Sequence, residues 1–365
     1  MPEKATIVIL QGYLDTAEWP EMSALWERLR ASREVLAQWS GEEQSPRVRP
    51  IEHWLCKQLG WPPSPLEGLQ VWPRSLGPGR ADAYQVLLSP CHFDVRLDHV
   101  GVRGLGNAPL DADEAHALCA SLHDSLDAWS QWLGGALHIR CLSAMHWVAE
   151  VPAYADLEGC SLALAEGLSV ERYLPRGEHA RIWRRMLNEI QMLWHEHPVN
   201  LRRAQARRPP VNALWFGGRL EPPGPRESPA AQESAASANA QGQRLASRRL
   251  HVRSQDPMLK GLEAYLEAQR DQGACAAPNA PVRSAFAEAS CELVVMELED
   301  SARHVQAVER ALNQALRIAE TCARAGEDCE LVVLSDTAWI HWVKRQPRGL
   351  SAQLADLGLR LLGRR

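Results

Sequence analysis

Long apolar runs are missing from this sequence: no stretch of about 18 residues, close to the length needed to cross a bilayer, is both apolar and free of charge. The short apolar run TIVIL, residues 6–10, is too short for the core of a signal peptide. We therefore expect a soluble, cytoplasmic protein that does not bind a membrane.

Closely spaced cysteines are missing as well, because the nine cysteines are scattered and never form a CxxC motif. They stand at positions 56, 91, 119, 141, 160, 275, 291, 322 and 329. A disulfide framework or a zinc knuckle needs tighter grouping than this. We expect most of these thiols to be buried apolar side chains in a reducing compartment.

An excess of basic charge is also absent, since 40 Lys and Arg against 45 Asp and Glu give a formal net charge of −5. This balance excludes a general nucleic-acid coating protein. One basic cluster near the C-terminal end leaves open a scaffold that binds a protein or nucleic acid. It consists of Lys344, Arg345, Arg348, Arg360, Arg364 and Arg365.

Hydrophobic periodicity predicts an α/β protein. Strands are expected at residues 5–10, 83–89, 291–299 and 329–336, and helices at 112–133, 176–197 and 304–326. Short apolar runs that alternate with long helices indicate a sheet with parallel strands and helices on its faces. In such sheets chemistry gathers at the carboxyl ends of strands, which here hold Gln11, Glu299-Asp300 and Ser335-Asp336.

Residues 220–247 differ in composition from the rest of the chain. The segment is rich in Pro, Ser and Ala and has almost no large apolar residues, so it cannot form a core. We expect a flexible linker or loop there. It separates an N-terminal part, residues 1–219, from a C-terminal part, residues 248–365, that completes the α/β domain.

Two groups of residues suggest a metal site. Asp300 and His304 are one helical turn apart, so a carboxylate oxygen and an imidazole nitrogen could reach one ion. Asp336, at the end of a predicted strand, suits a third ligand. The alternative is that Asp300 and Asp336 cap the next turn and His304 is an ordinary surface residue.

A third group follows the predicted helix 176–197. Asn200, Arg203 and Asn212 could form a polar cradle in which Arg203 offers its fork to a phosphate or carboxylate. The alternative is that these side chains brace loops by hydrogen bonding to the backbone. His195 and His197 are two residues apart and make a poor metal pair.

The segment NEIQMLWHEHPVNLRRAQARRPPVNALWFGG, residues 188–218, resembles a signature of the RpfE-type bacterial regulatory proteins. That group is similar to the archaeal-type cofactor-independent phosphoglycerate mutases, and weaker similarity extends to YQVLLSPCHF, residues 84–93. The resemblance implies an alkaline-phosphatase-like fold: a central, mostly parallel sheet with helices on both faces and an inserted cap at about residues 100–175. It also implies ligand-binding roles for His197, Asn200, Arg203 and Asn212.

The chain departs from the family pattern at its metal motifs. The first predicted strand ends in Gln11-Gly12 where the family has Asp-Gly. Of the family's D-x-x-G-H-D motif Asp300 and His304 persist, but Arg303 and Val305 replace the Gly and the last Asp. The resemblance therefore implies at most one divalent ion, Mn²⁺, Zn²⁺ or Mg²⁺, held weakly by Asp300, His304 and Asp336.

Other departures affect the catalytic groups and one turn. The family's G-D-H motif keeps Asp336 but has Thr337 in place of its His, and the nucleophilic Ser has no match. Arg207 stands where the family has a Gly between Arg203 and Asn212. Two-metal phosphoryl transfer needs both ions and an aligned nucleophile, so these losses argue against the family's activity.

Three functions remain open from the sequence. The first is a non-catalytic, phosphoglycerate-mutase-like protein with a regulatory role or a site for an anionic metabolite, a phosphorylated or carboxylate small molecule. The second is an active metal-dependent phosphomutase or phosphatase with an altered metal site. The third is a scaffold that works through a protein partner or nucleic acid; the net charge does not favour the nucleic acid.

Overall fold

The chain divides into two compact units, each drawn from separate parts of the sequence. The computed structural model describes residues 4–11, 20–31, 33–40, 47–71, 82–153, 155, 157–220, 249–276, 290–297, 305–334 and 338–344. The first unit comprises Met1–Glu3, Ser40–Leu293 and Asp336–Ala338, and the second Lys4–Trp39, Val294–Ser335 and Trp339–Arg365. The predicted linker 220–247 is not a boundary between the units, and its residues from 221 onward lie outside the described residues.

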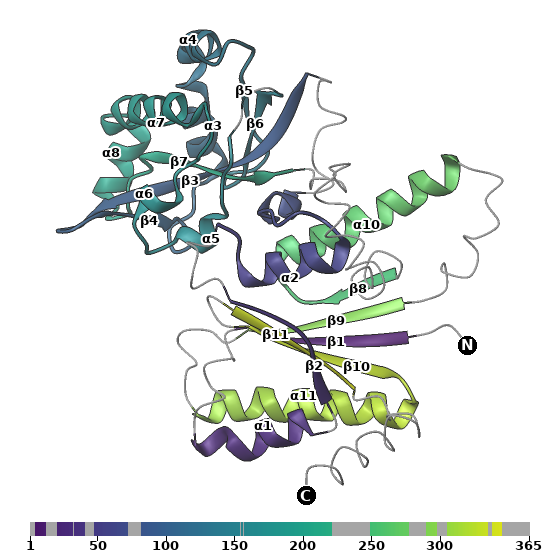
Figure 1. Cartoon of the computed structure of the whole chain (residues 1–365). Coiled ribbons are helices and arrows are strands. Elements are labelled where there is room, and N and C mark those ends of the chain that lie inside the picture. Colours follow the sequence, from purple (N-terminus) through teal and green to yellow (C-terminus); the bar gives the residue numbers. More distant parts are fainter. Residues whose placement is uncertain are drawn as a thin grey trace, which may run out of the picture. The chain divides into compact units, whose positions relative to one another are not determined.

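The first unit is built around an antiparallel sheet (Figure 1). Its strands are β3 (Ala83–Val95), β4 (Val100–Gly104), β5 (His138–Cys141), β6 (Trp147–Pro152) and β7 (Ala213–Arg219). The first unit also contains β8 (Arg249–Arg253), which is not a strand of this sheet. The order is β4-β3-β6-β5, with β7 also paired to β3, and the β3–β4, β3–β6, β3–β7 and β5–β6 pairings are all antiparallel. The long strand β3 is therefore the centre of this sheet.

Helices cover both faces of that sheet. The helices of the first unit are α2 (Pro50–Leu59), η3 (Glu67–Val71), α3 (Ala112–Ala120), α4 (His123–Leu133), α5 (Leu162–Ala165), α6 (Val170–Tyr173), α7 (Ala180–His195), α8 (Pro198–Gln205) and α10 (Pro257–Ala276). Val86 and Leu88 of β3 pack with α3, α4 and α7, whereas Cys91 and Phe93 pack with α5 and α6. This division follows from the alternation of side chains along a strand.

The second unit contains the parallel strand pairing. Its elements are β1 (Lys4–Gln11), η2 (Pro20–Met22), α1 (Ser23–Arg30), β2 (Arg33–Ser40), α11 (Val305–Ala325), β10 (Asp328–Leu334) and β11 (Ala338–Lys344), together with the second half of β9 (Ser290–Glu297). The strand order is β2-β11-β10-β1-β9. β1 and β10 are parallel, from Ala5 opposite Asp328 to Gln11 opposite Leu334, and β10 and β11 are antiparallel.

Both long helices of the second unit lie on the same side of its sheet (Figure 1). Val8 and Leu331 from the strands pack there against Trp26 of α1 and Leu312 of α11. The helical spacing of the apolar residues in 304–326 had predicted α11, and the apolar runs had predicted β1, β9 and β10.

The predicted α/β class is confirmed, with two differences in detail. The strand pairings of the first unit are antiparallel, so the mostly parallel character expected of a central sheet applies only to the second unit, at β1–β10. The segment 100–175, expected as a cap, contains β4 and β6, which pair directly with β3. Within the described part of the chain, no helix is long and apolar enough to span a membrane.

Candidate functional site

The junction between α7 and α8 carries the segment that the sequence analysis singled out. α7 ends at His195, and Pro198 opens α8 at its first position, where a missing N–H costs nothing. His197 is the N-cap: its Nδ1 accepts a hydrogen bond from the Val199 N–H at 3.3 Å. Burial lowers the pKa of His197, and Arg202 adds to this effect, so the neutral imidazole is favoured for that acceptor role.

Asn200 is buried, and its amide is hydrogen-bonded to the chain's own backbone. Its Nδ2 donates to the carbonyl oxygens of Trp194 at 2.7 Å and Val211 at 2.8 Å. Its Oδ1 accepts from the Val211 N–H at 2.8 Å. The side chain thus ties the end of α7 to the approach of β7.

Arg203 lies one turn further along α8, and its side chain is 0% exposed. It forms an ion pair with Glu114 of α3, at 3.0 Å from Nη1 to Oε2. Nε donates to Pro209 O at 3.0 Å and Nη2 to Ala108 O at 2.6 Å. The fork of this arginine therefore connects α8 to α3 and to the loop before α3.

Asn212 joins β7 to β3. Its Oδ1 accepts from the Phe93 N–H at 2.6 Å, and its Nδ2 donates to Phe93 O at 3.0 Å. Its own backbone N–H donates to Cys91 O at 3.2 Å. The side chain thereby extends the ladder between the two strands by two hydrogen bonds.

These four residues lie in the same unit, on and around α8. Their side chains hydrogen-bond to other groups of the described chain, which is the bracing arrangement that the sequence analysis left open as an alternative. An anion at Arg203 would have to replace bonds that the guanidinium already makes. The ligand-binding role of His197, Asn200, Arg203 and Asn212 stays a prediction.

The carboxyl end of β1 is the other predicted location for chemistry. Gln11 ends that strand opposite Leu334, the last residue of the parallel strand β10. Its Oε1 is buried and has no hydrogen-bond partner among the described residues. Asp300, His304 and Asp336 lie outside the described residues, so the metal site stays a prediction. The residues that the structure does describe contain no group of three or more metal-ligating side chains.

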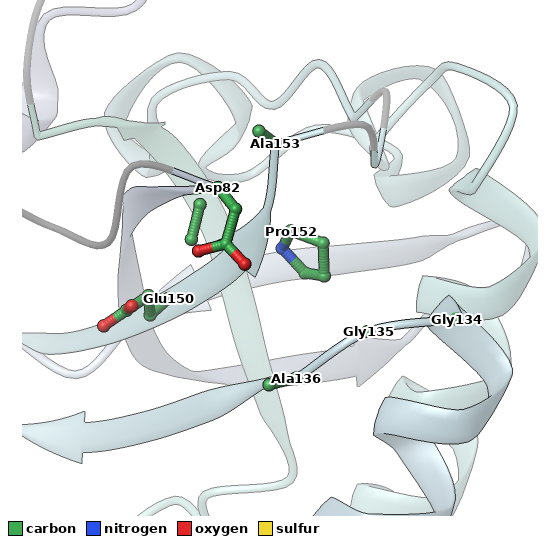
Figure 2. Close-up of a pocket in the computed structure, with 8 residues that line it drawn as sticks. Asp82, Gly134, Gly135, Ala136, Glu150, Pro152 and Ala153 are labelled. Carbon is green, nitrogen blue, oxygen red and sulfur yellow. The ribbon is translucent and has the colours of Figure 1, made fainter.

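A separate cavity of about 360 Å³ opens at one end of the antiparallel sheet (Figure 2). Figure 2 shows Asp82 before β3, Glu150 on β6 and the loop Gly134, Gly135 and Ala136 around it, and Ala83, Pro152 and Ala153 complete the lining. Glu150 Oε1 has no hydrogen-bond partner in the described part of the chain. Two carboxylates suit a cation or a hydrogen-bond donor and repel an anion, so this cavity does not fit the anionic metabolite expected from the sequence. No sequence motif pointed to it, because its two acids, Asp82 and Glu150, are single residues far apart in the sequence.

Comparisons with known proteins found similar solved structures, but no similar family model or curated protein. No protein-family model matches the chain, and no curated protein matches it. Among solved structures, the cofactor-independent phosphoglycerate mutase from Thermoplasma acidophilum is 16% identical, with 95% of this chain and 91% of that chain covered and a TM-score of 0.38. The PH0037 protein from Pyrococcus horikoshii is 12% identical, with coverage of 94% and 88% and a TM-score of 0.42. At these TM-scores, the α/β class is taken from the strands and helices of this chain alone.

Proposed function

We propose that this chain is a phosphoglycerate-mutase-like protein of the RpfE type that no longer transfers phosphate and acts by binding, in a regulatory role. The observation that carries the proposal is Gln11 at the carboxyl end of β1, beside the end of β10. The family that the sequence resembles has an aspartate there. A neutral amide is a much poorer ligand for a dication than a carboxylate, so a two-metal centre would lose charge at this edge.

The arrangement around α8 supports the same proposal. Phosphoryl transfer is catalysed mainly by positioning and by positive groups that face the transferred phosphate. Here the guanidinium of Arg203 faces Glu114 and backbone carbonyls. A buried arginine that is held in this way supports the fold and offers little to a substrate.

One observation favours a second candidate, an active phosphomutase or phosphatase with an altered metal site. The buried Oε1 of Gln11 has no hydrogen-bond partner within the described ranges, and such an atom needs an explanation. An ion held by Asp300, His304 and Asp336 could take this amide oxygen as a neutral ligand. Such an ion, when bound, would polarise a phosphoryl oxygen as a Lewis acid.

Metal content and turnover of the full-length protein distinguish the two candidates. The protein is purified without chelator and its Mn, Zn and Mg are counted by plasma mass spectrometry. It is then assayed with Mn²⁺ and 3-phosphoglycerate for isomerisation and phosphate release. We expect far less than one ion per chain, and turnover no higher than that of Asp336→Ala.

Gln11→Asp tests whether this edge is the family's metal site. The added carboxylate should increase Mn²⁺ retention at least tenfold, whereas Gln205→Asp, the same change at an exposed position of α8, should not. One ion per wild-type chain, with turnover that Asp300→Ala abolishes, would overturn the proposal and establish the altered-metal enzyme.

A further inference from the structure

The fold brings together two cysteines that are well separated in the sequence. Cys119 lies in the last turn of α3, and Cys141 is the last residue of β5. The Cys141 thiol lies 3.5 Å from the carbonyl oxygen of Ala115, which is one helical turn before Cys119 and on the same side of α3. The two thiols also lie within hydrogen-bonding reach of each other.

This pair differs from most other cysteines of the first unit in exposure and in acidity. Cys119 and Cys141 are partly exposed, whereas Cys56, Cys91 and Cys160 are buried. Burial raises the pKa of Cys56 and of Cys160 to about 12. The hydrogen bond with Cys141 lowers the pKa of Cys119, and His116 lowers it further, while the same bond raises the pKa of Cys141. Cys119 is therefore the more acidic thiol of the pair, and the thiolate is the reactive form.

We propose that Cys119 and Cys141 are a redox modification site, at which a peroxide converts the two thiols into one reversible disulfide. The Cys119 thiolate attacks one oxygen of hydrogen peroxide, the O–O bond breaks, and a sulfenic acid and hydroxide form. The Cys141 thiol then attacks the sulfenic sulfur, the S–S bond forms, the S–O bond breaks, and water leaves with the thiol proton. Two thiols lose two electrons and two protons, and one peroxide becomes two waters.

The location of the pair gives the modification a structural consequence. The disulfide fastens the end of α3 to β5, and α3 also carries Glu114, the partner of Arg203. Oxidation thus restrains the helix on which the bracing of α8 depends. In a reducing compartment such a bond is transient, as redox-sensing disulfides are.

The second unit contains a matched pair for comparison. Cys322 of α11 and Cys329 of β10 also lie within reach of each other, but both are buried in the core. Burial raises the pKa of Cys329 to about 12. Each pair thus brings two thiols together, whereas the exposure of the thiols differs between the pairs.

The test uses the full-length protein, treated under native conditions with hydrogen peroxide, and needs no variant for its main readout. We expect a mass loss of about 2 Da, a Cys119–Cys141 cross-linked peptide in a non-reducing digest, and its disappearance with dithiothreitol. Iodoacetamide should label Cys119 at least tenfold faster than Cys322 at pH 7. Cys119→Ser and Cys141→Ser should each abolish the cross-link, and Cys322→Ser should leave it unchanged.

Two results would overturn the proposal. One is that Cys119 and Cys141 both remain open to alkylation after peroxide treatment of the folded protein. The other is that Cys322 and Cys329 cross-link at the same rate as Cys119 and Cys141, because exposure and thiolate character would then have no effect.

Discussion

Arg203 shows how a residue type associated with anion binding becomes part of the framework of a fold. Its guanidinium is buried, and it pairs with Glu114 and donates to Pro209 O and Ala108 O. A buried ion pair is costly to assemble, but it is costlier still to leave one partner without the other. The pair therefore fixes the position of α8 against α3.

Arg203→Met should destabilise the protein by about 3–5 kcal/mol, because it leaves the Glu114 carboxylate and two carbonyls without their partner. Denaturant unfolding followed by circular dichroism measures this loss. Arg202→Met is the matched control, since Arg202 is exposed on the same helix, and it should change stability by less than about 0.5 kcal/mol. Equal effects of the two substitutions would contradict the bracing role.

Glu67 is a partly buried carboxyl group whose surroundings raise its pKa. Its Oε2 accepts from the Leu162 N–H at 2.9 Å, at the start of α5. Burial raises the pKa of Glu67 to about 7, and Glu52 adds to the increase, whereas Arg49 and the backbone hydrogen bonds oppose it. The folded protein thus keeps a proton on Glu67 at pH values where the unfolded chain has released it.

The sign of the effect on stability follows from proton linkage. Between the ordinary carboxyl pKa of 4.5 and about 7 the folded state binds more protons, so this group makes the protein less stable as pH rises through that window. From pH 5 to pH 8 the loss should amount to about 3 kcal/mol. Glu67→Gln keeps an oxygen acceptor but cannot ionise, so the variant should lack this part of the pH dependence.

Unfolding midpoints of wild type and Glu67→Gln at pH 5 and pH 8 give the comparison. Glu171→Gln serves as the control, because Glu171 is exposed on α6. Parallel pH profiles for all three proteins would show that Glu67 ionises normally in the folded state.

At the scale of elements, the end of α8 holds an arginine in a left-handed conformation. The Arg207 N–H donates to Ala204 O at 3.0 Å and the Arg208 N–H to Arg203 O at 2.8 Å, which is the bonding of a Schellman motif. This motif requires a left-handed residue after the C-cap, and Arg207 has a φ of 55°. Glycine adopts this conformation without steric cost, whereas a side chain is strained there.

Arg207→Gly should therefore stabilise the protein by about 0.5–1 kcal/mol, because relief of strain at a left-handed position outweighs the extra freedom of glycine in the unfolded chain. A higher midpoint in urea with an unchanged slope is the expected result. Arg208→Gly is the control. It removes the same charge at the following residue, where φ is not positive, and it should not stabilise the protein. A loss of stability in Arg207→Gly would mean that its side chain makes contacts worth more than the strain.

The sequence predicted elements best where local periodicity decides them. The helix expected at 176–197 is α7, Ala180–His195, and its apolar stripe is the buried face. The helix expected at 112–133 is interrupted, because the Ser121 hydroxyl donates to Leu118 O at 2.7 Å and also accepts from Trp194 Nε1 at 3.0 Å. This second bond comes from another helix and has no signature in the local pattern.

Long-range partners account for what the sequence could not predict. β11 was not expected, because it contains His341, a polar residue that is buried next to Glu330 of β10, with 2.8 Å between His341 Nε2 and Glu330 Oε2. The polar residues around α8 were identified, but not their partners: Glu114 lies 89 positions from Arg203, and Phe93 lies 119 positions from Asn212. A sequence pattern identifies the hydrogen-bonding side chains, whereas the fold determines whether they face a ligand or other parts of the chain.

At the scale of the whole molecule, the second unit can form only when the two ends of the chain meet. β1 lies between β10 and β9 in the sheet, and Ala5 pairs with Asp328. Removing β1 would leave backbone groups of both neighbours unpaired and would take Val8 and Leu10 out of the core. Folding of the C-terminal part of the sequence thus depends on the first strand, β1.

Residues 249–365 expressed alone should therefore be unfolded, with no cooperative melt by circular dichroism. Co-expressed with residues 1–220, they should form a soluble complex that co-purifies and melts cooperatively, because every described strand and helix is then present. The matched control replaces 1–220 by 20–220, which removes β1 and keeps α1 and β2. Since the missing strand carries the parallel pairing with β10, this shorter fragment should fail to rescue the C-terminal one. A cooperative melt of 249–365 by itself would show instead that β9, β10, β11 and α11 form a stable core without β1.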